Sequence, residues 1–598
     1  MKKLSLALLV IAALLVGLLP AAVAQDEERV SRFGEYSGYS EAIYDGYART
    51  SQYVEVRDGT RLAVDIFRPT LASEVVTDPL PVVWTHHRYH RVTEENGQLI
   101  TLIDSYPDLT QLLYHGYVIG VVDVRGGGAS FGTREGEFTP AEALDAYDMT
   151  EWFAAQPWCS GNVGMFGISY LAITQYMAAS TQPPHLKAIF PQMAMFDLYS
   201  FVYPGGVFNE NFLNNWGGGT FMLDRLTPAV PVDDDPDGVL LAEARKQHKK
   251  NWNIIELTSN YPFRDAQGSP TGIDVPLYVE RSPSSFINEI NASGVAIYHL
   301  GGWYDIYPRD PLVWFNNLTV PQKVVMTHWN HEGSGDFDLL AEHLRWFDYW
   351  LKDIDNGIMD EPPITYRVMG ADEWRTTDTW PLPSEQRTPF YLGEAGTLTS
   401  DAPASDTASD SFQVDYTATT GTATRWTNGF GGPFGYPLMN EQAKRSLAYT
   451  TEPFAENVEI TGHPVMHLWV TSTAEDGDFF AYLEEVDAAG NAYMLSEGVL
   501  RASHRALHDA PWNYLDLPYH RGFAEDVQPL LAGEPVELVF EITPTSNVFE
   551  AGSSLRVRIA GADADNFGTP ELEPPPVITL YRDAAHASYI ELPVIPAQ

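Results

Sequence analysis

Between residues 50 and 195, short apolar runs alternate with helix-like stretches, and this alternation limits the possible folds more than any other feature. Apolar runs without polar alternation are typical of parallel strands covered on both faces. Before the third run, Thr139, Pro140 and Glu142 mark a helix start as N-cap, first helical residue and capping-box partner. The pattern predicts a doubly wound α/β sheet that binds ligands at the carboxyl ends of its strands. The four runs are 81–84, 117–122, 163–166 and 188–190.

The rest of the chain divides into further regions. Residues 198–286 lose the alternation and are rich in aromatics and glycines, which predicts a helical cap inserted into the sheet domain. Apolar runs resume at 295–300 and 323–326, and residues 344–351 predict a closing helix. Short alternating strands follow residue 362 and predict a β-sandwich of the jelly-roll type, with an exposed loop at 398–424. The predicted domains are a core of residues 45–197 and 287–361, a cap of 198–286 and a β domain of 362–598.

The first 24 residues resemble a secretory signal peptide, with two lysines, an apolar run at 4–19 and the small residues Ala22-Val23-Ala24. Cleavage after Ala24 predicts a secreted or periplasmic protein without a membrane anchor. The formal net charge of the 598-residue chain is −44, and such an acidic surface repels nucleic acid. Cys159 is the only cysteine, so an intrachain disulfide is excluded.

The pentapeptide Gly167-Ile168-Ser169-Tyr170-Leu171 lies between an apolar run and a helix-like stretch. A serine on a sharp strand-to-helix turn exposes its hydroxyl, and the backbone N–H groups after it face whatever the hydroxyl attacks. Leu171 stands where the strict nucleophile-elbow pattern has glycine. A buried structural serine is therefore the alternative interpretation of this turn.

A serine nucleophile needs a base, and the base needs an orienting carboxylate. Asp305 follows the run 295–300, and His331 follows the run 323–326, so a carboxylate and an imidazole lie at successive strand ends. In α/β-hydrolases the chain order is serine, acid, histidine. By position alone His328 is an equal candidate for the base, and Asp310 is another nearby carboxylate.

Several segments together resemble one known family. They are Arg57 to Asp65, Asp123-Val124-Arg125-Gly126, Trp158 to Leu171, Gly302-Trp303-Tyr304-Asp305, Trp329-Asn330-His331, Asp478-Phe479 and Pro544 to Phe549. In this order they resemble the CocE/NonD-type serine hydrolases, which include bacterial cocaine esterase, α-amino acid ester hydrolases and Xaa-Pro dipeptidyl-peptidases. The resemblance covers most of the chain.

The resemblance implies a nucleophile at Ser169, an acid at Asp305 and a base at His331. It also implies an oxyanion hole formed by the backbone N–H of Tyr170 and the hydroxyl of Tyr89. Two positions depart from the family pattern: Ala172 replaces a glycine, and His87-Arg88-Tyr89 replaces Asn-Pro-Tyr. No acid follows Asp305 until Asp310, which argues against a clamp for a substrate ammonium.

We therefore predict a secreted serine hydrolase that cleaves carboxylic esters with bulky or aromatic acyl groups through an acyl-serine intermediate. It needs a small-molecule substrate, and we expect no cofactor and no metal. A peptidase or amidase on the same triad and a non-catalytic polymer-binding protein are the alternatives, and a homodimer is left open. The aromatic residues expected to line the substrate pocket are Phe201, Phe208, Phe212, Trp216 and Trp303.

Overall fold

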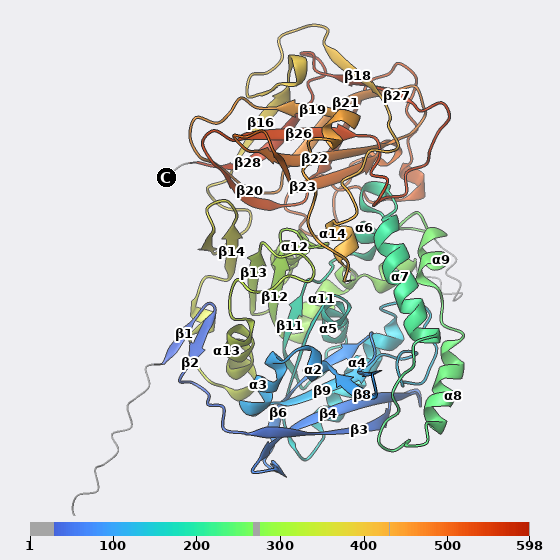
Figure 1. Cartoon of the computed structure of the whole chain (residues 1–598), viewed down its shortest axis with the longest axis vertical. Helices are drawn as coiled ribbons and strands as arrows, with labels where there is room; N and C mark the ends of the chain where they lie inside the picture. Colours follow the sequence, from blue (N-terminus) through green and yellow to red (C-terminus); the bar gives the residue numbers. More distant parts are fainter. Residues whose placement is uncertain (1–28, 267–275, 430, 597–598) are drawn as a thin grey trace, which may run out of the picture.

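The computed structural model describes residues 29–266, 276–429 and 431–596. The predicted signal peptide lies outside the described residues. In the part of the chain that is described, no helix combines the length and the apolar character needed to cross a membrane. Figure 1 shows an α/β domain in the lower half, helices of the insertion along one side and a β domain above.

The core is one mixed sheet in which the predicted apolar runs are neighbours. The strands β10 to β13 and the pairs β6–β10 and β6–β9 are parallel, whereas β3, β4 and β15 run antiparallel to their neighbours. In spatial order the strands are β15 (Glu373–Thr377), β14 (Ile364–Val368), β13 (Gln322–Thr327), β12 (Ala296–Gly302), β11 (Leu186–Gln192), β10 (Cys159–Ile168), β6 (Leu80–His87), β9 (Val118–Asp123), β4 (Arg61–Leu71) and β3 (Gly46–Glu55), with β5 (Glu74–Val75) beside β4.

Helices cover both faces of this sheet. Successive strand residues point to opposite faces, so a run of apolar residues places apolar side chains on both faces, and both must be buried. Val82 and Trp84 pack into one buried cluster together with residues of α4 and α5, whereas Val83 packs into another together with residues of α3 and α13. The α/β architecture predicted from the sequence is thus confirmed. The covering helices are α3 (Asp108–Tyr114), α4 (Pro140–Ala154), α5 (Tyr170–Ser180), α11 (Ile287–Ser293), α12 (Asp310–Asn317) and α13 (Leu339–Lys352).

The core sheet extends beyond its predicted end at residue 361, since β14 and β15 still belong to it. The N-terminal hairpin of β1 (Val30–Arg32) and β2 (Glu35–Ser37) contacts α13. A second hairpin, β7 (Val92–Glu95) and β8 (Gln98–Thr101), precedes α2 (Leu102–Ser105). The helices of the insertion are α6 (Leu198–Val202), α7 (Glu210–Arg225), α8 (Val239–His248), α9 (Ile254–Ser259) and α10 (Leu277–Arg281).

The C-terminal domain consists of two antiparallel sheets that enclose a separate apolar core. Leu468 and Phe540 of one sheet meet Leu483 and Val557 of the other in this core. The larger sheet holds β16 (Gln386–Leu392), β17 (Leu398–Thr399), β18 (Ser409–Gln413), β20 (Val458–Gly462), β21 (Val465–Ser472), β24 (Val536–Glu541), β25 (Thr545–Phe549), β27 (Val577–Tyr581) and β28 (Tyr589–Ile595). The smaller holds β19 (Leu447–Thr450), β22 (Asp478–Val486), β23 (Ala492–Arg501) and β26 (Ser554–Ala560).

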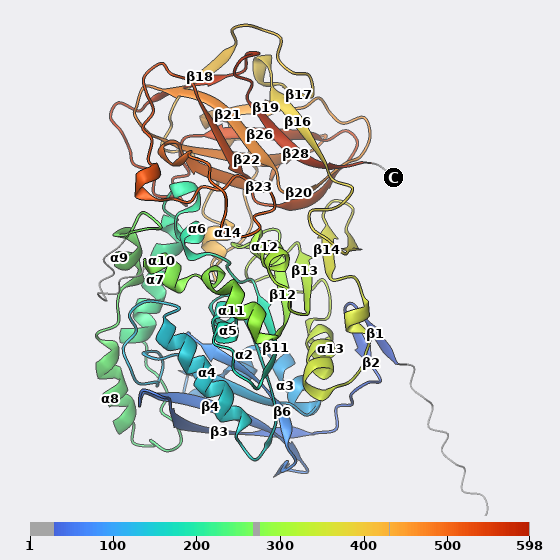
Figure 2. The ribbon, with the colours of Figure 1, turned by 180° about the vertical axis from the view of Figure 1, so that it is seen from behind.

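The segment 398–424, predicted as an exposed loop, contains two strands instead. β17 pairs with β16, and β18 pairs with β27 at the edge of the larger sheet. The short helix α14 (Arg425–Asn428) follows this segment. Seen from either side, α14 lies where the β domain meets the α/β domain (Figures 1 and 2).

Candidate active site

Ser169 occupies a strained turn between β10 and α5. Its backbone has φ 60° and ψ −124°, a conformation that is costly for a residue with a side chain. The turn is tight because Gly167 has φ 142°, and a Cβ at that position would lie 2.5 Å from Leu171 Cβ. The Ser169 N–H donates to Gln192 O of β11 over 2.9 Å. Tyr170 is the first residue of α5, so its N–H has no partner within the helix.

Asp305 and His331 meet at the ends of neighbouring parallel strands, β12 and β13. The His331 Nδ1 and Asp305 Oδ1 atoms are 2.5 Å apart, and both side chains are buried. The Tyr307 N–H donates to the other carboxylate oxygen of Asp305 over 3.0 Å. The ring can thus donate from Nδ1 to the carboxylate, which leaves Nε2 as an acceptor. Nε2 is buried and has no hydrogen-bond partner among the described residues.

The two alternative residues lie in other environments. His328 is about half exposed, with its Nδ1 2.5 Å from Asp336 Oδ2. Asp310 is buried at the start of α12, where it accepts a hydrogen bond from Phe196 N over 2.7 Å and pairs with Arg309. The structure therefore pairs His331 with Asp305 and not with Asp310.

Tyr89 follows β6, and its hydroxyl oxygen accepts a hydrogen bond from Trp216 Nε1 over 3.0 Å. Burial raises the pKa of Tyr89 to about 12, even though the hydrogen bond from Trp216 and the charge of Arg88 act to lower it. The phenol therefore keeps its proton at neutral pH and can donate it in a hydrogen bond.

Ser169 opens into a largely apolar pocket, to which the inserted helices contribute most of the wall. Phe201, Phe212 and Trp216 line it as expected from the sequence, together with Tyr307 of the core. The Phe201 ring lies 4.8 Å from those of Phe212 and Tyr307, measured between centroids. The remaining lining residues are Glu137, Phe138, Tyr170, Ile173, Met195, Leu198, Val202, Leu213, Ile254, Leu257, Thr258, Leu277 and Arg281.

Two residues expected in this wall lie elsewhere. Phe208 precedes α7, packs on Tyr203 and forms a β-bridge with Gly568 of the β domain. Trp303 is fully buried, and its indole N–H donates to Arg367 O of β14 over 2.8 Å. Neither lines the Ser169 pocket, because each is held by a different part of the chain.

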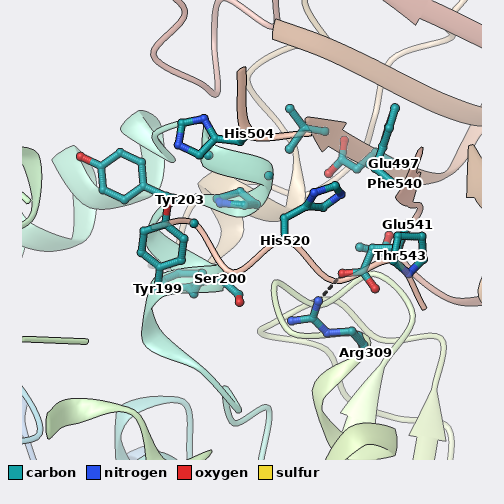
Figure 3. Close-up of a pocket in the computed structure, with 18 of the residues that line it drawn as sticks. Tyr199, Ser200, Tyr203, Arg309, Glu497, His504, His520, Phe540, Glu541 and Thr543 are labelled. Carbon is teal, nitrogen blue, oxygen red and sulfur yellow. Dashed lines mark hydrogen bonds and ion pairs between the residues drawn. The ribbon is translucent and has the colours of Figure 1, made fainter. Parts of the chain in front are cut away.

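A second cavity lies where the insertion, the core and the β domain meet (Figure 3). It shares Phe201 and Tyr307 with the Ser169 pocket, but its wall is more polar. Glu497, His504 and Glu541 of the β domain line it, and Arg309 of the core pairs with Glu541. The sequence does not indicate that these β-domain residues belong to the site. No local pattern relates them to the carboxyl ends of β12 and β13, which lie far from them along the chain.

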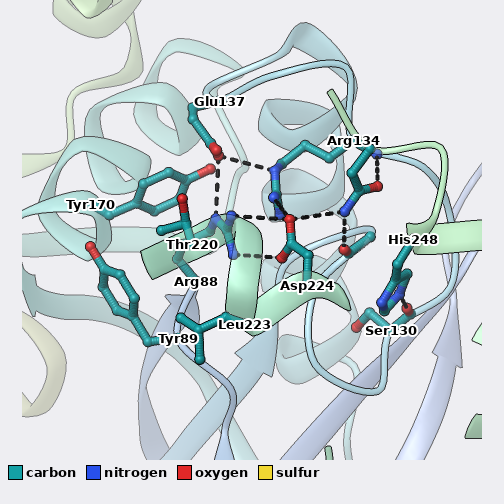
Figure 4. Close-up of polar contacts among 12 residues, drawn as sticks. Arg88, Tyr89, Ser130, Arg134, Glu137, Tyr170, Thr220, Leu223, Asp224 and His248 are labelled. Atoms are coloured by element: carbon teal, nitrogen blue, oxygen red, sulfur yellow. Dashed lines mark hydrogen bonds and ion pairs between the residues drawn. The ribbon is translucent and has the colours of Figure 1, made fainter. Parts of the chain in front are cut away.

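A buried group of charges, the cap-side cluster, lies behind Tyr89 (Figure 4). It consists of Arg88, Arg134, Glu137 and Asp224, all at most 6% exposed as side chains. Asp224 of α7 accepts from Arg88 Nη1 over 2.9 Å and contacts Arg134, and Glu137 Oε2 lies 3.4 Å from Arg88 Nε and 3.1 Å from Arg134 Nε. Although burial acts to raise it, the two guanidinium groups lower the pKa of Asp224 to about 2. The cluster therefore joins the Tyr89 turn to the insertion.

Comparison with known proteins identifies the family of this chain. Residues 58–333 match the model of the X-Pro dipeptidyl-peptidase (S15) family, and residues 356–591 match that of the X-Pro dipeptidyl-peptidase C-terminal non-catalytic domain. A putative serine esterase of Mycobacterium bovis is 34% identical over 92% of this chain and 96% of its own length. The chain belongs to the S15 family of serine hydrolases.

Other relatives of this S15 hydrolase share the architecture. The cocaine esterase of a Rhodococcus species is 29% identical, with 91% of this chain and 97% of that protein covered. A CocE/NonD family hydrolase from Staphylococcus aureus superposes with a TM-score of 0.71 at 22% identity, covering 92% of this chain and 94% of that one. An α-amino acid ester hydrolase superposes with a TM-score of 0.68 at 18% identity, covering 96% and 100%. The predicted family and fold class are confirmed.

Proposed function

We propose that this S15 hydrolase cleaves carboxylic esters with a catalytic triad of Ser169, His331 and Asp305. The observation that carries the proposal is the 2.5 Å contact between His331 Nδ1 and Asp305, at the same sheet edge as the strained turn of Ser169. The contact fixes the tautomer of the imidazole and leaves Nε2 to act as the base. The names of the esterase relatives support ester chemistry.

In the proposed reaction, Ser169 Oγ attacks the ester carbonyl carbon while His331 Nε2 takes the hydroxyl proton. The oxyanion that forms accepts hydrogen bonds from the Tyr170 N–H and the Tyr89 hydroxyl. The C–O bond to the alcohol then breaks, and His331 gives its proton to the leaving oxygen. A water molecule, deprotonated by His331, hydrolyses the acyl-Ser169 intermediate and restores the enzyme.

The Ser169 pocket supports a bulky apolar acyl group. Aliphatic and aromatic side chains from the insertion make up most of its wall, and its two charged lining residues are also engaged elsewhere. Glu137 contacts Arg88 and Arg134, and Arg281 pairs with Glu280. Apolar acyl groups gain from burial against such a wall, whereas a free substrate ammonium would need a carboxylate of its own.

The first test is hydrolysis of a chromogenic ester series, from acetyl to benzoyl, by the wild type and by Ser169→Ala. We expect Ser169→Ala to lower kcat about 10⁴-fold or more, because the nucleophile is lost. Ser180→Ala, at the far end of the helix α5 that follows Ser169, is the control and should keep wild-type activity. Mass spectrometry of the wild type after rapid quenching should find the acyl group on Ser169.

The series also separates the candidate substrates. A preference for benzoyl over acetyl esters supports the pocket assignment, and the reverse order contradicts it. Release of Xaa-Pro dipeptides only from substrates with a free amino terminus would favour the peptidase alternative. Full activity in Ser169→Ala would refute the triad.

A further inference from the structure

The short helix α14 of the β domain reaches into the catalytic domain. Arg425, Trp426 and Asn428 on it are buried, with Arg425 fully so. The helix contacts α7 of the insertion, and in both views it lies below the sheets of its own domain (Figures 1 and 2). A helix of one turn has no stability of its own, so its position depends on the contacts its side chains make.

Arg425 contacts the backbone of the proposed triad acid. Its Nη1 donates to the carbonyl oxygen of Asp305 over 3.0 Å. Asp305 is thus held at two points: its carbonyl from the β domain, and its carboxylate by Tyr307 N and His331. A hydrogen bond from a charged guanidinium in a buried place is among the stronger ones that proteins make.

The position of Arg425 is in turn fixed within the β domain. Its Nε lies 3.2 Å from Glu497 Oε1 of β23 and 3.3 Å from the Tyr436 hydroxyl. The neighbouring Trp426 also donates from Nε1 to Glu497 over 3.0 Å. We call Arg425, Tyr436 and Glu497 the β-domain cluster. Because β23 belongs to a sheet, the cluster ties Asp305 to a rigid part of the β domain.

Asn428 makes a matching contact with the loop of the proposed base. Its Oδ1 lies 3.3 Å from the backbone nitrogen of Glu332, the residue after His331, and shares this N–H donor with Asn330 Oδ1 at 3.0 Å. Its Nδ2 donates to Gly432 O over 2.9 Å, which orients the amide. Side chains three positions apart share one face of a helix, so Arg425 and Asn428 can hold two loops of the core at once.

We propose that α14 is a positioning element for the catalytic pair, with Arg425 and Asn428 as its positioning residues. The inference rests on the proposed triad. It gives a role to the domain that matches a non-catalytic family model: this domain sets the backbone from which Asp305 meets His331. A displacement of about 1 Å in such a pair can cost about 100-fold in rate.

The test compares Arg425→Met, Arg425→Lys and Asn428→Ala with a control, Arg558→Met, in the full chain. Arg558 is an equally buried arginine of the β domain whose Nε bonds to Glu484 over 2.9 Å, away from the triad loops. We expect Arg425→Met to lower kcat by about 10- to 100-fold with KM changed less than about threefold. Arg425→Lys should recover part of the loss, and Asn428→Ala should lower kcat less than Arg425→Met.

A merely structural role would not change the contact between His331 and Asp305. The hydrogen bond between His331 and Asp305 gives a low-field proton NMR signal, as short Nδ1–H···O bonds do. This signal should shift or broaden in Arg425→Met and persist in Arg558→Met. The inference is overturned if kcat in Arg425→Met stays within twofold of the wild type, or if Arg558→Met loses as much. Should Arg425→Met not fold, Arg425→Lys and Asn428→Ala decide by the same two readouts. Activity in Ser169→Ala would refute the triad itself, independently of α14.

Discussion

Two buried arginine clusters flank the proposed catalytic residues, and they differ in charge balance. The cap-side cluster pairs two arginines with two carboxylates behind Tyr89, and the β-domain cluster pairs Arg425 with Glu497 and a neutral tyrosine behind Asp305. The first joins the core to the insertion, and the second joins it to the β domain. Each therefore connects one side of the site to a different neighbouring domain.

The number of arginines beside each carboxylate determines how each cluster responds to pH. Two guanidinium groups outweigh burial at Asp224 and lower its pKa to about 2, so it stays charged in any ordinary buffer. At Glu497 burial outweighs the single charge of Arg425 and raises the pKa to about 7. A buried carboxylate with two cationic partners thus stays ionised at ordinary pH, whereas one with a single cationic partner can become protonated near neutral pH.

The largest expected effect on stability comes from removing the charge of Asp224. Asp224→Asn leaves Arg88 and Arg134 buried with only Glu137 as an acidic partner, so we expect about 3–5 kcal/mol less free energy of unfolding. The control is Asp148→Asn, which breaks the pair with the 45% exposed Arg57 and should cost less than about 1 kcal/mol. Urea unfolding at pH 7 measures both. Equal losses would mean that the cap-side cluster is no stronger than a surface pair.

The pH response of Glu497 should produce the next largest effect. Because its folded pKa is raised from 4.5 to about 7, the folded state binds a proton that the unfolded state has released, so its contribution to stability is lost as pH rises between these values. At about 1.4 kcal/mol per pKa unit, the loss amounts to about 3 kcal/mol.

Glu497→Gln should remove that part of the pH dependence, since an amide does not titrate in this range. Unfolding free energies at pH 5 and pH 8 measure the change, with the exposed Glu441→Gln as the control. An unchanged difference between the two pH values in Glu497→Gln would contradict the assignment.

The smallest expected effect concerns Tyr89, which the cap-side cluster holds through Arg88. Trp216→Phe keeps an aromatic ring but removes the N–H that donates to the Tyr89 hydroxyl. A hydrogen bond is worth about 1 kcal/mol, so we expect kcat/KM to fall by up to about tenfold. Tyr89→Phe sets the upper limit, on the order of 100-fold, if the hydroxyl stabilises the oxyanion.

Trp346→Phe on α13 is the matched control for this prediction, because its indole N–H is bound to Ile189 O and the residue does not line the pocket. It should cost stability without changing kcat/KM. If Trp346→Phe and Trp216→Phe lower kcat/KM equally, the contact between Trp216 and Tyr89 has no special part in catalysis.

The α/β core could be predicted from the sequence because its signals are local. Each predicted apolar run between residues 81 and 326 became a strand of one sheet, and the helix start at Thr139 is present with its N-cap hydrogen bond. A parallel sheet brings the ends of its strands to one edge, so Ser169, Asp305 and His331 could be named as candidates together. The repeat did not indicate the order of the strands in space, in which β6 lies between β10 and β9.

Other features could not be predicted because they depend on partners far along the chain. β15 carries Glu373 and Arg375, and β18 alternates exposed and half-buried residues, so neither has the apolar run of a covered strand. Asp224 meets Arg88 across 136 positions, and Arg425 meets Asp305 across 120. Similarly, Phe208 and Trp303 are aromatic residues of the type that lines pockets, but only the tertiary fold shows that each packs against other parts of the chain.

Helix α7 is fastened at both ends to different domains. Near its start, Asn211 N donates to Asn566 O of the β domain over 3.0 Å, and near its end Asp224 is part of the cap-side cluster. Because contacts hold both ends of α7, the helix cannot rotate about one end as a hinged lid does. Moving it away from Ser169 would require both sets of contacts to break. We therefore expect substrate to reach Ser169, and product to leave it, with α7 in place, so that the size of the substrate is limited by side chains and not by a moving helix.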